Sequence, residues 1–93
     1  MTWLEMRSNP KKVYKLLVDS LKDKYQYKEG SDGVQFKTKN GVPFNVFVMG
    51  NEAPWDFLVI EYEDIGEDGD AYYPSDYDTF EMMLEAMIKE IDG

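Results

Sequence analysis

Residues 34–49 constrain the fold most, because their pattern predicts a β-hairpin whose register can be derived. A two-residue loop at Asn40 and Gly41 would mix polar and apolar side chains on both faces of the hairpin. A loop that also includes the preceding lysine pairs Phe36 with Phe44 and makes one face apolar throughout. We therefore predict a type I turn followed by Gly41 in the left-handed conformation, where glycine has no Cβ penalty.

This register assigns every side chain of the hairpin to a face. The predicted core face carries Val34, Phe36, Val42, Phe44, Val46 and Val48. The opposite face begins polar and becomes apolar at Phe47 and Met49.

The next apolar run, residues 55–62, predicts a strand buried on both faces over its middle. If Leu58 and Ile60 of this strand face the helices, the outward side chains of Phe47 and Met49 are joined by Trp55, Phe57 and Val59.

One helix is expected before the strands in the chain and another after them. Ser8, Asn9 and Pro10 predict a helix start, and the apolar residues that follow at a spacing of four are Val13, Leu17, Leu21 and Tyr25. Asp78 is the expected cap of a second helix, whose apolar stripe is Phe80, Met83, Leu84, Met87, Ile88 and Ile91.

Two further segments complete the predicted order. Residues 25–29 alternate as a short strand does, and residues 30–33 form a turn cluster. We predict a single α+β domain over residues 1–93, a two-layer sandwich of an N-terminal helix, a four-stranded antiparallel meander and a C-terminal helix. Residues 1–7 are an N-terminal arm, and residues 61–78 are an acidic loop.

The composition narrows the chemistry. The chain has no cysteine and no histidine, which excludes His- and Cys-based nucleophilic catalysis and argues against a zinc site. No apolar run reaches the roughly 18–20 residues of a membrane span, and residues 1–7 lack the features of a signal peptide. We expect a cytoplasmic protein without a cofactor or a membrane partner.

The net charge of −9 is unevenly distributed. Residues 1–39 hold nine basic and five acidic residues, a net charge of +4, whereas residues 40–93 hold one basic and fourteen acidic residues, a net charge of −13. This asymmetry favours a partner with a basic surface and argues against direct nucleic-acid binding by the acidic half. Acids that only keep a small domain soluble would produce the same count.

The first candidate binding surface is the outer sheet face, with Phe47, Met49, Trp55 and Phe57. A contiguous apolar patch usually marks an interface. Three occupants remain open: the chain's own Trp3, Leu4 and Met6, a second copy in a homodimer, or a foreign protein.

The second candidate is the acidic, tyrosine-rich loop. Its expected partner-binding residues are Glu63, Asp64, Glu67, Asp68, Asp70, Tyr72, Tyr73 and Asp76. An EF-hand that begins at Asp64 fails because Gly66 and Ser75 occupy ligand positions, so at most weak calcium binding is expected. Carboxylates among tyrosines can instead meet the lysines and arginines of a partner.

Two smaller candidates involve methionine and paired carboxylates. Met82, Met83 and Met87 could line an adaptable groove, although the last two lie on the apolar stripe of a helix and favour a core position. Asp68 with Asp70, or Asp76 with Asp78, are the available acid–base pairs for an enzyme, and no phosphate loop or nucleophile elbow accompanies them.

In its order of elements and its charge, the chain resembles small bacterial secretion chaperones and acidic inhibitors that imitate DNA. The resemblance assigns no individual residue. The sequence favours a non-catalytic protein-interaction module that acts through the acidic loop, the outer sheet face, or both. The alternatives are a decoy inhibitor of a nucleic-acid-binding protein and a small carboxylate-dependent enzyme.

Overall fold

The computed structural model describes residues 2–31, 33–50, 57–62 and 67–93, and for residues 67–70 it describes the backbone. The elements follow in the order α1 (Trp3–Met6), α2 (Pro10–Lys22), β1 (Gln26–Gly30), β2 (Gly33–Lys37), β3 (Pro43–Met49), β4 (Phe57–Tyr62), β5 (Glu67–Tyr72), η1 (Pro74–Asp76) and α3 (Phe80–Ile91).

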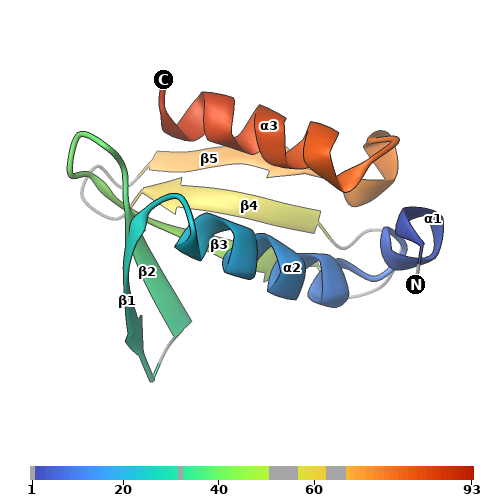
Figure 1. The fold of residues 1–93 in the computed structure, drawn as a ribbon, viewed down its shortest axis with the longest axis horizontal. Coiled ribbons are helices and arrows are strands. Elements are labelled where there is room, and N and C mark those ends of the chain that lie inside the picture. Colours follow the sequence, from blue (N-terminus) through green and yellow to red (C-terminus); the bar gives the residue numbers. More distant parts are fainter. Residues whose placement is uncertain (1, 32, 51–56, 63–66) are drawn as a thin grey trace.

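The molecule has two layers. One antiparallel sheet with the strand order β1-β2-β3-β4-β5 forms the first layer. Helices α2 and α3 form the second and lie on the same face of the sheet (Figure 1). The predicted α+β class and its helix–meander–helix order are therefore confirmed.

The number of strands differs from the prediction, because part of the expected acidic loop is a fifth strand. Strand β5 pairs with β4, with Leu58 opposite Tyr72 and Tyr62 opposite Glu67, and the register shifts between Val59 and Glu61. The β5 sequence is rich in Asp and Gly and lacks β-branched residues, so it carries no strand signal of its own. Pairing with β4 decides the conformation of β5 and places β4 inside the sheet, whereas β4 would be an edge strand in the predicted four-stranded meander.

The derived hairpin register is confirmed at the turn. Phe36 lies opposite Phe44, and the Thr38 amide donates to the Val42 carbonyl at 2.9 Å. The Gly41 amide donates to the Thr38 carbonyl at 2.9 Å, and Gly41 has a φ of 85°. The three-residue loop with a left-handed glycine is therefore present as predicted.

The core lies between the helices and the sheet. Val13, Leu17 and Leu21 of α2 are fully buried, as are Met83 and Met87 of α3, so these methionines belong to the core and line no groove. Of the predicted core face, the structure buries Phe36, Phe44 and Val46, and half-buries Val34, Val42 and Val48.

The two helix starts differ in how well they were predicted. Asn9 occupies the N-cap of α2 with Pro10 as its first helical residue, as expected. Helix α3 is capped by Thr79, whose hydroxyl accepts from the Met82 amide at 3.2 Å, and the prediction of Asp78 as the cap is wrong by one residue.

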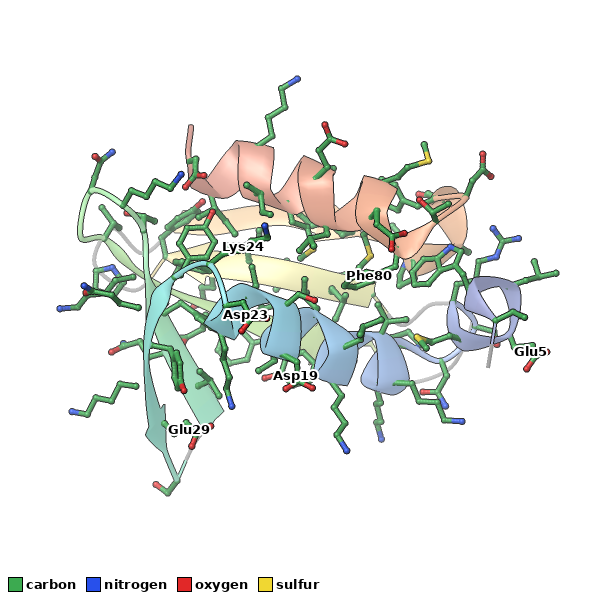
Figure 2. All side chains as sticks on the ribbon, viewed as in Figure 1. Glu5, Asp19, Asp23, Lys24, Glu29 and Phe80 are labelled. Atoms are coloured by element: carbon green, nitrogen blue, oxygen red, sulfur yellow. The ribbon has the colours of Figure 1, made fainter. Side chains whose placement is uncertain are left out.

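The N-terminal arm packs at one end of the helical layer. The Trp3 indole N–H donates to the Tyr77 carbonyl at 2.9 Å, and Arg7 donates to the same carbonyl at 3.2 Å. The Trp3 ring also meets the edge of the Phe80 ring, with centroids 5.9 Å apart. Phe80, labelled in Figure 2, is the first residue of α3. Leu4 stays 69% exposed. The arm therefore occupies a place other than the outer sheet face.

The β1–β2 hairpin turns away from the other three strands (Figure 1). Pairing between β2 and β3 ends at Phe36 and Phe44. The predicted register, continued along the strands, would pair Val34 with Val46, and this pair is not formed. An ion pair from Lys22 of α2 to Glu29 of β1 ties the hairpin to α2, and the Lys22 ammonium also lies 5.3 Å from the centre of the Tyr27 ring. Figure 2 shows Glu29 on the part of the hairpin beyond the end of α2.

None of the helices in the described ranges combines the length and the apolar character that a membrane span requires.

Candidate partner-binding face

The outer face of the sheet is built by the alternation of β3 and β4. Leu58 and Ile60 are fully buried against the helices, so their neighbours Phe57 and Val59 point to the opposite side. The strand register places Phe47 opposite Val59 and Met49 opposite Phe57. Cross-strand partners share a face, and these four side chains therefore form one apolar cluster.

Tyr73 extends this cluster beyond the end of β5. Its ring lies 5.1 Å from that of Phe57, centroid to centroid, at an interplanar angle of 37°. Phe47 is 37% exposed, Met49 46% and Tyr73 37%, while Phe57 and Val59 are half-buried. We call this set, Phe47, Met49, Phe57, Val59 and Tyr73, the apolar face.

Several predicted site residues meet on this face. Phe47, Met49 and Phe57 lie together as the derived register requires. Trp55, the fourth predicted member, lies outside the described residues. Tyr73 was predicted with the acidic loop, and it lies against Phe57 instead. The two candidate surfaces of the sequence thus meet at Tyr73.

The Tyr72 side chain points to the core face of the sheet, opposite to the apolar face. It is 7% exposed and belongs to the core, and its hydroxyl donates to the Glu90 carboxylate of α3 at 2.7 Å. The alternation of β5 separates the two tyrosines, because successive residues of a strand point to opposite faces. Tyr72 therefore connects the sheet with α3 and does not contribute to the predicted binding surface.

The predicted acidic residues are spread over different elements. Glu67, Asp68 and Asp70 lie on β5, where Asp68 is opposite Glu61 of β4 in the register. Asp76 lies on η1 and is exposed. Glu63 and Asp64 lie outside the described residues. Among the carboxylates whose side chains are described, no three come close enough together to hold a metal ion.

The two expected acid–base pairs are described to different extents. Asp76 and Asp78 are both exposed near the surface turn before α3. Asp68 and Asp70 are described by their backbone alone, two residues apart on an edge strand.

The pKa values of Tyr25 and Lys22 are shifted, and both groups belong to the scaffold. Burial raises the pKa of Tyr25, and its hydrogen bond of 2.9 Å to the Asp92 carboxylate acts in the same direction. The hydrogen bond to Glu29 raises the pKa of Lys22. The first interaction ties the residue after α2 to the end of α3, and the second ties α2 to the hairpin.

Two members of the apolar face were not among the residues predicted for the first candidate binding surface. Val59 was placed outside by alternation but was not selected as a site residue. Tyr73 was missed as a face residue because β5 was not recognised, and the adjacent pair Tyr72 and Tyr73 is the signal that could have indicated alternation.

Comparison of the chain with models of protein families, with curated proteins and with solved structures finds no match.

Proposed function

We propose that this protein is a non-catalytic interaction module that binds a protein partner through the apolar face. The observation that carries the proposal is the contiguous exposure of Phe47, Met49 and Tyr73 around Phe57. Contiguous apolar side chains on a soluble domain are typical of interfaces, and aromatic residues and methionine are enriched there. These residues lie opposite the core, so the fold itself does not require their apolar character.

The charge next to this face suggests the chemistry of the partner. Glu61 is exposed on the same strand as Phe57, and Asp76 and Asp78 follow Tyr73 along the chain. Residues 40–93 have a net charge of −13. A partner with an apolar centre and a basic surround complements such a surface, and its charges would also speed the encounter.

Two other functions remain as proposals of lower rank. The charge asymmetry supports a decoy that occupies the basic surface of a nucleic-acid-binding protein. A second copy of the chain could also cover the apolar face, although two equally acidic molecules repel each other. Identifying the captured molecule distinguishes both alternatives from the main proposal, because the decoy would capture a nucleic-acid-binding protein and the dimer a second copy of this chain.

The test is capture of partners from the lysate of the native host with three variants on one face of the sheet. Phe47→Ser and Phe57→Ser should reduce capture strongly, because each removes an apolar ring from the centre of the face. Asn45→Ser is the matched control, since Asn45 lies on the same strand and face as Phe47 but outside the cluster. Light scattering on the free protein measures whether it is a monomer or a dimer.

The salt dependence of capture distinguishes the contribution of the acidic surface from that of the apolar face. Loss of the partner at high salt would favour the acidic surface, whereas capture that survives salt but not Phe57→Ser would favour the apolar face. Equal capture by all three folded variants would contradict the proposal.

A further inference from the structure

The separation of β2 from β3 opens a cleft of about 390 Å³ beside the sheet. Its walls include Tyr14 of α2, Val34 of β2, and Val46 and Phe47 of β3. The cleft begins where the pairing of Phe36 with Phe44 ends.

The main chain of β3 is open toward this cleft. The Thr38 amide bonds to the Val42 carbonyl, so the even-numbered residues of β3 direct their N–H and C=O groups toward β2. Val46 and Val48 continue this series, and no described residue pairs with them on that side. Asn45, Phe47 and Met49 direct their main-chain groups toward β4, which pairs with them. One edge of an interior strand is thus open over two repeats of the ladder.

Contacts on both sides of the cleft keep β2 and β3 apart. The pair of Phe36 and Phe44 closes one end of it, with the two rings stacked at 5.4 Å. The contacts of Lys22 with Glu29 and Tyr27 tie β1 to α2, and β2 pairs with β1 along its whole length. These contacts therefore hold the β1–β2 hairpin at a distance from β3.

We propose that the open edge of β3 at Val46 and Val48 binds an extended peptide segment of a partner, which adds a strand to the sheet beside β3. Main-chain donors and acceptors at a two-residue spacing complement an extended backbone, whereas a helix satisfies its own main-chain groups internally. Tyr14 and Val34 line the inner side of the cleft and Phe47 lies on the outer side. The segment that fits has apolar side chains toward Tyr14 and Val34, and polar side chains on the outer side, where Gln35 and Asn45 also line the cleft. The proposal goes beyond the proposed function because it uses main-chain groups, whereas the apolar face uses side chains.

Amide hydrogen exchange tests the open edge without any substitution. In the free protein, the amides of Val46 and Val48 should exchange faster than those of Asn45 and Phe47, which bond to β4. The probe is a short acetylated and amidated peptide of alternating threonine and valine, added at millimolar concentration. It should slow exchange at Val46 and Val48 by about tenfold or more and leave Asn45 and Phe47 unchanged. Protected Val46 and Val48 amides in the free protein, or unchanged exchange with the peptide present, would overturn the proposal.

A pair of variants at one position separates main-chain from side-chain recognition. Val48→Pro removes an N–H from the open edge of β3. It should leave the β3–β4 ladder intact, because alternation makes Val48 and Leu58 a pair without main-chain hydrogen bonds. Val48→Ala shortens the same side chain and keeps the N–H. Peptide affinity should fall about tenfold in the proline variant and change less than about twofold in the alanine variant.

Equal losses in the two folded variants would mean that the peptide contacts side chains only, and would overturn the proposal. Phe57→Ser is the control for the apolar face, since Phe57 does not line the cleft. Peptide binding should survive this variant even where capture of a protein partner fails, so failure of the proposed function and failure of the edge are distinguishable.

Discussion

Two phenylalanines on β3 show how one strand serves both the core and the apolar face. Phe44 is fully buried, and its ring contacts those of Tyr25, Phe36 and Tyr62. Phe47, three residues later, is 37% exposed on the opposite side of the sheet. The same residue type is therefore part of the core at one position and exposed at the surface at the other.

This difference predicts unequal losses of stability. Phe44→Ala should lower the free energy of unfolding by about 3–5 kcal/mol, because it removes a fully buried ring and leaves a cavity. Phe47→Ala should lower it by about 1 kcal/mol or less. Urea unfolding of the two variants measures both values. Similar losses would mean that Phe47 is a core residue and would remove it from the apolar face.

Tyr25 predicts how stability depends on alkaline pH. Its pKa is raised in the folded protein by burial and by the Asp92 carboxylate, so the folded chain holds this proton more tightly than the unfolded chain does. The resulting stabilisation is complete below the ordinary tyrosine pKa of 10.0 and declines above it, by at most about 1.4 kcal/mol per pH unit.

Tyr25→Phe should remove this contribution to the pH dependence. Urea unfolding from about pH 9 to about pH 11.5 measures the slope of the free energy of unfolding against pH for the variant and the original protein. Tyr27→Phe is the matched control, because Tyr27 is 49% exposed. A slope that is the same in all three proteins would contradict the role of Tyr25.

At the scale of elements, the β2–β3 turn depends on one backbone angle. Gly41 has a φ of 85°, and a Cβ built at this position meets nothing within 4 Å. Gly41→Ala should therefore cost about 1–2 kcal/mol of stability through backbone strain alone. Asn40→Ala, at the adjacent loop position, should cost clearly less. Thermal unfolding compares the two, and equal costs would contradict a conformational requirement at Gly41.

The contact of α1 with the start of α3 depends on a hydrogen bond and a ring contact that one substitution can separate. Trp3→Phe retains an aromatic ring near Phe80 and removes the donor to the Tyr77 carbonyl. We expect a loss of about 0.5–1.5 kcal/mol in the free energy of unfolding. Leu4→Ala on the exposed side of α1 is the control. An unchanged stability of the Trp3 variant would show that α1 does not stabilise the domain through this bond.

At the scale of the whole molecule, charge opposes compactness. A net charge of −9 on 93 residues repels itself, and salt screens this repulsion. The midpoint of thermal unfolding should therefore rise between about 20 and 200 mM sodium chloride, where the Debye length shortens from roughly 20 to 7 Å. Calorimetry at the two salt concentrations measures the change, and a midpoint that falls would show that attractive ion pairs dominate.

Local chemistry is enough to predict the helices from their apolar stripes and the three-residue turn from the requirement of one apolar face. It also predicts the outward position of Phe47, Met49 and Phe57 from alternation. These features depend on residues close together in the chain. The tertiary structure decided three others: that residues 67–72 form β5, that Tyr73 joins the apolar face, and that β2 leaves β3 after Phe36. Each of these depends on contacts between separate elements of the fold. The edge of β4 imposes the strand on an Asp- and Gly-rich segment, and the contacts of α2 with β1 hold the hairpin away, which no local pattern indicates.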